Sequence, residues 1–201
     1  MRAEGLLQRH RPSGRRRRPG YFRVERPDQL WHMDMTRIWV ADHGWCYLNA
    51  IVDCCTREIP GWALDLRCRR QEAAAVVDAA VAGHEIRPGR LTLGTYNGTA
   101  YTSRGLPSHL AGLGVAHRRG GYRDPESQAC IESWFSKLKE RMVWRSEFET
   151  LDEARAAIAA YVETYHHRPH SGLGYRPPKE VRRTWEDAQE SEASTKSCGL
   201  G

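Results

Sequence analysis

The chain has 201 residues, of which 40% are hydrophobic and 28% are charged, the balance of an ordinary globular domain. No apolar stretch is long enough to span a membrane, and the N-terminus lacks the apolar segment of a signal peptide. The six cysteines contain no C-x-x-C pair, so their spacing predicts neither a zinc knuckle nor a disulfide framework. These features exclude a membrane protein and a disulfide-stapled secreted domain, and they favour a cytoplasmic protein.

The positive charge is concentrated at the N-terminus. Residues 1–26 contain nine arginines and two glutamates, a local charge of +7, so within the net charge of +6 the remaining residues sum to −1. Such an arginine run either binds the phosphates of nucleic acid or forms a solvated arm without a specific target. Residues 1–20, rich in Gly, Pro and Arg, are predicted to be a basic, disordered arm.

Extended segments dominate the first half of the chain. Residues 30–40, 45–54 and 60–66 are joined by short links and are rich in β-branched and aromatic residues, which predicts an antiparallel meander. An alanine-rich helix over 71–82, capped by Gly83, is expected next. The elements expected after it are a strand at 90–94, a helix at 102–112 and a strand at 114–118. This order predicts a mixed five-stranded sheet with helices on both faces, the arrangement of the ribonuclease-H-like fold.

Two longer helices follow a loop marked by Gly120, Gly121 and Pro125. The first begins near residue 127 and carries an apolar stripe at three- and four-residue steps: Ile131, Trp134, Phe135, Leu138 and Met142. The second begins with a capping box formed by Thr150 and Glu153. A short last helix is expected near 179–187, so residues 21–187 form one domain and residues 188–201 a disordered tail.

Two carboxylates are placed where burial would need compensation. Asp34 stands in the sequence WHMDMT inside the first predicted strand, where a divalent cation would offset its desolvation. Glu132 shares one helix edge with Ser136 and Lys139, which allows a metal-binding carboxylate and a phosphate-binding amine on the same face. A solvent-facing strand position for Asp34 and a solvated Glu/Lys helix face remain the alternatives at this point.

Five motifs carry a resemblance to a known family. WHMDMT, YLNAIVDCCTREIPGW, YNGTAYTS, IESWFSKLKER and YHHRPHSGLGYRPPKEV occur in this order between residues 21 and 187. Together they resemble the orfB-type transposases of bacterial insertion sequences, which have an integrase core of the retroviral type. The resemblance implies a catalytic triad of two Asp and one Glu that holds two Mg²⁺ or Mn²⁺ ions, with Asp34 as the first member and Glu132 as the last.

Tyr96 stands where the resemblance places the second catalytic Asp. The family motif reads H-S-D-x-G-x-x-Y-T-S, and the matching stretch begins at Gly94. The 35 residues between Tyr96 and Glu132 agree with the family spacing. A phenol is neutral near pH 7 because its ordinary pKa is about 10, and Tyr96 is expected to be buried beside the two carboxylates. We therefore expect impaired strand cleavage on an intact scaffold. Asp53, Asp124 and Glu126 do not match the missing position, so substitution by one of them is not favoured.

Basic residues near the catalytic helix are candidates for DNA contacts. The sequence favours Lys139, the basic residue seven positions after the Glu, and adds Lys137, Arg119 and Arg123. The histidines at 166, 167 and 170 are interpreted as packing and turn residues, and the seven tryptophans as core and hairpin residues.

The expected function is DNA transposition by metal-dependent cleavage and strand transfer, impaired in this chain. The partners implied are transposon-end and target DNA, further copies of the chain in a transposition complex, and a first-frame protein carrying a helix-turn-helix. One alternative is a non-catalytic nucleic-acid-binding remnant of a transposase; a weaker one is a ribonuclease-H-like nuclease of another lineage.

Overall fold

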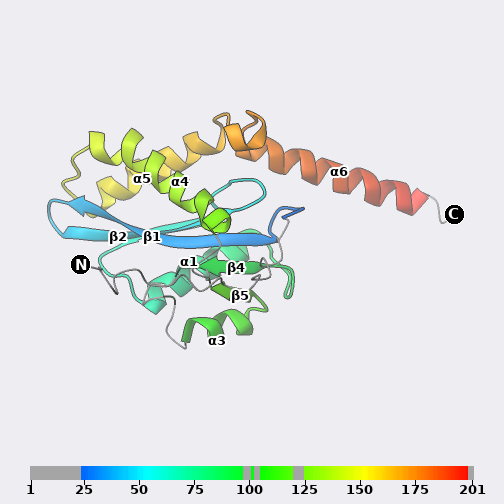
Figure 1. The fold of residues 1–201 in the computed structure, drawn as a ribbon, viewed down its shortest axis with the longest axis horizontal. Coiled ribbons are helices and arrows are strands. Elements are labelled where there is room, and N and C mark those ends of the chain that lie inside the picture. Colours follow the sequence, from blue (N-terminus) through cyan, green and yellow to red (C-terminus); the bar gives the residue numbers. More distant parts are fainter. Residues whose placement is uncertain (1–23, 97–100, 102–104, 120–124, 199–201) are drawn as a thin grey trace, which may run out of the picture.

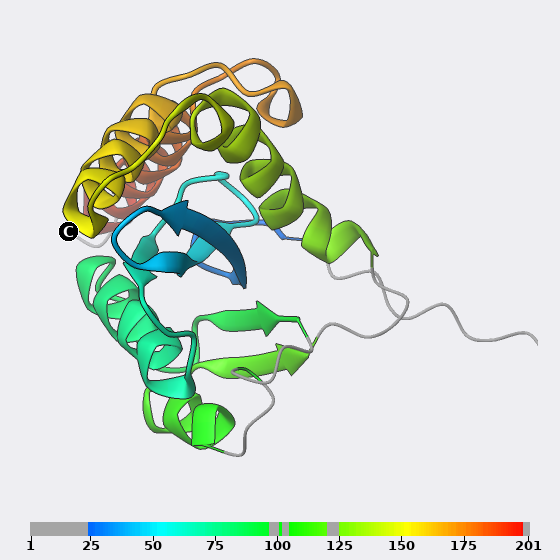
Figure 2. The same cartoon turned by 90° about the vertical axis from the view of Figure 1, so that its left-hand side faces the viewer.

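A twisted five-stranded sheet forms the centre of the protein (Figures 1 and 2). The computed structural model describes residues 24–96, 101, 105–119 and 125–198. The strands are β1 Leu30–Val40, β2 Gly44–Asp53, β3 Gly61–Asp65, β4 Thr92–Thr95 and β5 Ala116–Arg119. Their order is β3-β2-β1-β4-β5, with β1 to β3 antiparallel and with β4 and β5 parallel to β1. The mixed five-stranded sheet expected from the sequence is confirmed.

Helices cover both faces of this sheet, as expected. On one face lie α1 Arg70–Gly83 and α3 Gly105–Gly112; on the other lie α4 Pro125–Arg141 and α5 Leu151–His166. Each face has its own cluster of buried apolar side chains. The chain therefore builds a three-layer arrangement in which the sheet is apolar on both sides.

The alternation of side chains along β1 decides which residues face α4. Ile38 and Val40 belong to the cluster under α4 and α5, whereas Trp31 and Met33 belong to the cluster over α1 and α3. Because successive strand residues point to opposite faces, Asp34, which is four residues before Ile38, lies on the α4 side of the sheet.

The helix ends differ in detail from the sequence predictions. Helix α1 includes Gly83, and His84 is its C-cap, so the glycine does not terminate the helix as expected. Helix α4 begins at Pro125, earlier than predicted, because the fixed φ of proline suits the first turn of a helix. At the start of α5, the Thr150 hydroxyl accepts a bond from the Glu153 backbone N–H at 3.2 Å. The Glu153 carboxylate accepts from the N–H of Glu149 at 3.0 Å, whereas the expected capping box would use the N–H of Thr150.

The C-terminal helix is longer than the sequence suggested. Two short 3-10 turns, η1 Val143–Arg145 and η2 Ser171–Leu173, precede and follow α5, and α6 then runs from Pro178 to Cys198. The segment 188–198, expected to be disordered, is thus helical, and it extends away from the sheet (Figure 1). The predicted basic arm and the loop at 120–124 lie outside the described residues. None of the helices in the described part is long and apolar enough to cross a membrane.

Arg182 connects α6 to the core through ion pairs with buried and half-buried carboxylates. Its guanidinium donates to both carboxylate oxygens of Asp28, at 2.8 and 3.0 Å, and also to Glu58, and lies 3.7 Å from Asp53. Burial would raise the pKa of Asp28, but the hydrogen bonds and charge of Arg182 outweigh it and hold that pKa below its ordinary value. A four-residue polar cluster thus joins the start of β1, the end of β2 and α6.

Candidate active site

Asp34 and Glu132 come from two adjacent layers of the molecule, the sheet and the helices packed on it. Asp34 lies in the middle of β1 on the face covered by α4, and Glu132 lies on α4 at its exposed edge. Burial raises the pKa of Asp34, and the negative charge of Glu132 raises it further, although the backbone N–H of Met35 opposes both effects. The charge of Glu132 therefore disfavours ionisation of Asp34, an effect that a bound cation would offset.

Tyr96 is the next residue after β4, beside Asp34. The parallel pairing of β1 and β4 ends at Met33 and Thr95, so the next residues along the two strands are Asp34 and Tyr96. This is the adjacency that a second catalytic carboxylate would need. The side chain of Tyr96 is 54% exposed, so it is not buried between the carboxylates as expected.

A second departure from the family motif lies two residues earlier. Gly94 stands at the position of the motif's His, and a Cβ at Gly94 would lie 2.8 Å from the imidazole of His32 on the neighbouring strand. The His32 ring therefore occupies the space that a side chain at position 94 would need. The local packing is adapted to glycine at this position.

The motif around Tyr96 is anchored beneath the sheet by Tyr101. Its hydroxyl donates to the amide oxygen of Asn49 on β2 at 2.9 Å, and the thiol of Cys68 contacts the same oxygen at 3.8 Å. Burial raises the pKa of Tyr101, and the charge of Asp34 contributes to that shift. Tyr101, the second tyrosine of the YNGTAYTS motif, is therefore a buried hydrogen-bond donor that connects the chain after β4 to the centre of the sheet.

Other carboxylates do not complete the pair within the described part of the chain. Asp53 is fully buried, pairs with Trp31 in the β1–β2 register, and accepts hydrogen bonds from the backbone of Asp28, Cys55 and Thr56. It is therefore already engaged away from Asp34. Asp124 and the side chain of Glu126 lie outside the described residues. Among the described residues, no group of three His, Cys, Asp or Glu side chains is arranged to hold a metal ion.

The basic candidates are divided between two flanks of α4. Lys139 lines a groove of about 860 Å³ between α4, the turn after it and the β1–β2 hairpin. Lys137 lines a separate pocket of about 200 Å³ on the other flank of the helix. Arg119 ends β5 opposite Thr95, near the start of the Tyr96 segment, and Arg123 lies outside the described residues.

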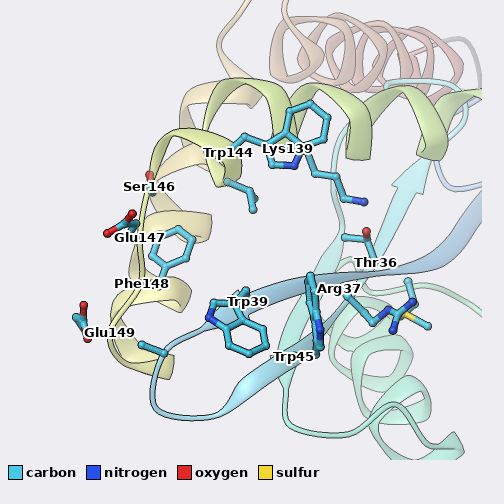
Figure 3. Close-up of a pocket in the computed structure, with 13 residues that line it drawn as sticks. Thr36, Arg37, Trp39, Trp45, Lys139, Trp144, Ser146, Glu147, Phe148 and Glu149 are labelled. Carbon is cyan, nitrogen blue, oxygen red and sulfur yellow. The ribbon is translucent and has the colours of Figure 1, made fainter.

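The groove beside Lys139 is lined by aromatic rings (Figure 3). Trp39 and Trp45 face each other across the hairpin with ring centroids 5.3 Å apart, and the guanidinium of Arg37 lies 5.8 Å from the ring of Trp45. Lys139 reaches from α4 toward Thr36, whereas Glu147 and Glu149 lie at the opposite end. The cationic end of the groove is therefore the end nearer to Asp34.

Three tryptophans that line the groove are largely exposed, although Trp39 and Trp45 pack on each other across the hairpin as the sequence suggested. Trp39, Trp45 and Trp144 are 56%, 55% and 72% exposed, whereas Trp31 and Trp134 are core residues as expected. Exposed aromatic faces beside basic side chains can stack with nucleic-acid bases. Alternation along β1 places Trp39 on the face opposite to Ile38 and Val40, the same face as the buried Trp31. The exposure of Trp39 therefore depends on how far the helices on that face extend over the hairpin, which no short window of sequence contains.

The histidines after α5 make local structural contacts, in agreement with their predicted role. The His166 ring accepts from the Ile59 backbone N–H at 3.0 Å, His167 pairs with Glu163, and the His170 ring accepts from the Gly172 N–H at 3.1 Å. These bonds tie the end of α5 to the segment before β3 and shape the η2 turn.

Comparisons with known proteins show the family to which the chain belongs. The integrase core domain family matches residues 24–125, and a second integrase core domain description matches residues 113–178. The transposase for insertion sequence element IS904 of Lactococcus lactis is 32% identical over 164 residues, which cover 81% of this chain and 64% of the relative. The transposase InsF for insertion sequence IS3A of Escherichia coli is 27% identical over 161 residues, which cover 79% of this chain and 55% of the relative. The chain thus spans only about 55% to 64% of the length of these relatives.

Two solved structures share the fold at low sequence identity. The catalytic core domain of BIV integrase matches with a TM-score of 0.60 and 18% identity, covering 83% of this chain and 99% of that one. A chain of the simian T-cell lymphotropic virus intasome, in complex with PP2A regulatory subunit B56 gamma, matches with a TM-score of 0.67 and 18% identity, covering 86% and 60%. The ribonuclease-H-like fold is therefore confirmed, and the chain belongs to the integrase core domain family, among relatives of the insertion-sequence transposases.

Proposed function

We propose that this chain is the catalytic core, residues 21–187, of a DNA transposase whose cleavage and strand-transfer chemistry is impaired by Tyr96. The observation that carries the proposal is the meeting of Asp34 and Glu132 across two layers, with Tyr96 beside Asp34 on the neighbouring strand. The names of the relatives, transposases of insertion sequences, support DNA as the substrate. The exposed tryptophans and Lys139 in the adjacent groove also support it, since they suit bases and phosphates respectively.

The carboxylates suit one divalent cation better than two. Asp34 is half-buried with no basic side chain paired to it among the described residues, so Asp34 and Glu132 together would hold a Mg²⁺ or Mn²⁺ ion. When bound, a pair of such ions activates the attacking oxygen and stabilises the leaving oxygen at a phosphorus. Two ions carry four positive charges, and the neutral phenol of Tyr96 adds no negative charge to hold the second. Lys139 would position the scissile phosphate.

The proposed partners follow from the same substrate. A transposase core joins two element ends to a target, so several copies of the chain would act together on DNA. Recognition of the element ends would come from a helix-turn-helix protein or segment, because the relatives extend well beyond the length matched here. A non-catalytic chain could also enter such a complex and block it.

Restoring the carboxylate tests the proposal. Tyr96→Asp, Tyr96→Asn and the unaltered chain would be compared for Mn²⁺-dependent nicking of supercoiled plasmid DNA. Because losing even an outer partner of a metal site costs about 10- to 100-fold in activity, Tyr96→Asp should nick at least about a hundredfold faster than the other two. Adding Glu132→Gln to Tyr96→Asp should abolish the gain.

Two results would contradict impairment by Tyr96. One is nicking by the unaltered chain at the rate of Tyr96→Asp, with both activities lost on Asp34→Asn. The other is an equal gain from Tyr96→Asn, which would mean that removal of the ring, and not the added carboxylate, restores activity. Absence of nicking in all variants, combined with metal-independent DNA binding, would favour the non-catalytic remnant.

A further inference from the structure

A small pocket lies on the flank of α4 away from the tryptophan groove. It has a volume of about 200 Å³ and is formed by the turn after β2, the middle of α4, the end of α5 and the segment just after α5. These segments meet at one end of the α4–α5 layer (Figure 1). The polar and aromatic residues that line it are Arg57, Ser133, Trp134, Lys137, Tyr165 and His170.

Hydrogen-bond donors in this pocket are buried without acceptors. The Nε and Nη1 atoms of Arg57 and the Nε1 atom of Trp134 are buried and have no hydrogen-bond partner within the described part of the chain. A buried N–H without an acceptor is strongly unfavourable, and more so on a charged group, so such atoms in a folded protein call for a missing partner. All three atoms can only donate, so that partner must be an acceptor.

The backbone holds Arg57 rigidly at the pocket. Its φ of +65° is in the left-handed region, which is unfavourable for a side chain other than glycine. The Arg57 N–H donates to the Asp53 carbonyl at 2.9 Å, and its own carbonyl accepts from the Tyr165 hydroxyl at 2.9 Å. The carboxylate of Asp53 fixes the same turn by accepting from the backbone of Cys55 and Thr56. The turn therefore fixes the direction in which the Arg57 side chain leaves the backbone.

The remaining charges in the pocket are also positive or donating. Burial lowers the pKa of His170, and the charges of Lys137 and Arg57 lower it further. The His170 Nδ1 atom accepts from Gly172, so its neutral ring carries the proton on Nε2, which is a donor. No carboxylate lines the pocket among the described residues. Two cations and unpartnered N–H groups thus surround a space that no carboxylate of the described residues lines.

We propose that this pocket binds a phosphate group, with Arg57 and Trp134 as the donors buried at the site and Lys137 contributing charge. The proposal rests on the proposed function for its biological source, a backbone phosphate of the DNA held by the core. Ser133 and Lys137 follow Glu132 on α4, so a phosphate here would fasten DNA on the flank opposite to Lys139. A free phosphate ion offers the same chemistry, and the two sources are separable by experiment.

The test compares the full chain with Arg57→Asn, because asparagine tolerates the left-handed backbone while the guanidinium is removed. Lys137→Gln is the second variant, and Arg87→Asn, an exposed arginine before β4, is the control. Inorganic phosphate is titrated in EDTA, with sulfate-free buffer and constant ionic strength, and the melting temperature is followed. The unaltered chain and Arg87→Asn should gain melting temperature, whereas Arg57→Asn should gain none and Lys137→Gln less.

The second arm measures binding to a DNA duplex over a range of salt concentrations. If the source is DNA, Arg57→Asn should reduce the slope of log affinity against log salt by about 1 relative to Arg87→Asn. Phosphate stabilisation without a change in slope would assign the pocket to the free ion and overturn the DNA source. An equal phosphate response in all four proteins would overturn the site itself. Neither arm needs metal or nicking, so failure here is distinguishable from failure of the proposed catalytic function.

Discussion

Two groups of acidic side chains in this protein differ in whether a basic side chain compensates their negative charge. Asp28, Asp53 and Glu58 lie close together where β1 begins and β2 ends, and the guanidinium of Arg182 from α6 forms ion pairs with all three. Asp34 lies in the middle of β1 and Glu132 on α4 above it, and no basic side chain of the described residues forms an ion pair with either of them. The first group is self-contained, whereas the second is left with a charge that an outside cation would balance.

The pKa directions express this difference. Arg182 holds the pKa of Asp28 below its ordinary value in spite of burial, whereas burial and the charge of Glu132 raise the pKa of Asp34. The first group is not uniform, because burial raises the pKa of Asp53 to about 6 although three backbone N–H groups bond to its carboxylate. Acidic residues at close range are therefore not by themselves a sign of a metal site. A carboxylate that folding leaves uncompensated is the more informative feature, because selection for stability alone would have supplied a partner.

The largest effect is expected from removing the internal cation. Arg182→Met leaves three carboxylates in or near the core without their partner, which should lower the free energy of unfolding by about 3–5 kcal/mol at pH 7. Urea unfolding would measure it, with the exposed neighbour Arg183→Met as the matched control. Because the folded-state pKa of Asp28 is lowered, this stabilisation is lost as the pH falls below 3.8, so the two variants should converge in acid. Equal stability of the two at pH 7 would contradict the self-contained cluster.

A smaller effect is expected from completing the external site. Tyr96→Asp adds a third carboxylate beside Asp34, so without metal it should be less stable than Tyr96→Asn because of added repulsion. With Mn²⁺ at ten times its dissociation constant, Tyr96→Asp should gain about 1.4 kcal/mol in free energy of unfolding. Urea unfolding with and without EDTA measures both signs. If Mn²⁺ stabilised the Asp and Asn variants equally, position 96 would not be part of the cation site.

The smallest effect is expected from neutralising Asp34 alone. Its folded-state pKa is raised, so its contribution to stability is present below 3.8 and is lost as the pH rises through the folded pKa. Asp34→Asn should therefore be more stable than the unaltered chain at neutral pH in EDTA, with the advantage disappearing in acid. Asp42→Asn, in the exposed β1–β2 turn, serves as the control. A loss of stability at pH 7 in Asp34→Asn would mean that Asp34 is already compensated by the folded chain.

Local patterns were sufficient for most of the fold. The alternation and composition of β1 to β3 and the apolar stripe on α4 predicted those elements within a few residues, because their signals are contained in short windows. The segment 188–198 was predicted wrongly, since a polar composition does not distinguish a solvated helix from a disordered tail. The prediction that Gly83 caps α1 was also wrong, because a glycine near a helix end can be the last helical residue instead of the residue that follows it.

The sequence motifs predicted which residues belong to the candidate site, but not how their side chains are exposed or directed. The spacing between Tyr96 and Glu132 located the departure from the family, but the exposure of the Tyr96 ring depends on how the chain leaves β4. The sequence likewise grouped Lys137 and Lys139 as one basic patch, whereas packing of α4 on the sheet directs them to different cavities. Residues two positions apart on a helix, such as Lys137 and Lys139, are separated by about 200° around its axis, so they can face opposite flanks.

The sequence by itself determined the order of strands and helices, the family and the residue at each motif position, because these reside in local periodicity and in motif spacing. Only the tertiary structure decided which charges are neutralised. Arg182 meets Asp28 across 154 residues and Glu58 across 124, and Tyr165 meets Arg57 across 108. Contacts over such separations arise from the packing of layers, and no short window of sequence contains them. Among the described residues, this packing leaves Asp34 without an ion pair and the donors around Arg57 without an acceptor, and the proposed cation and phosphate sites rest on these two observations.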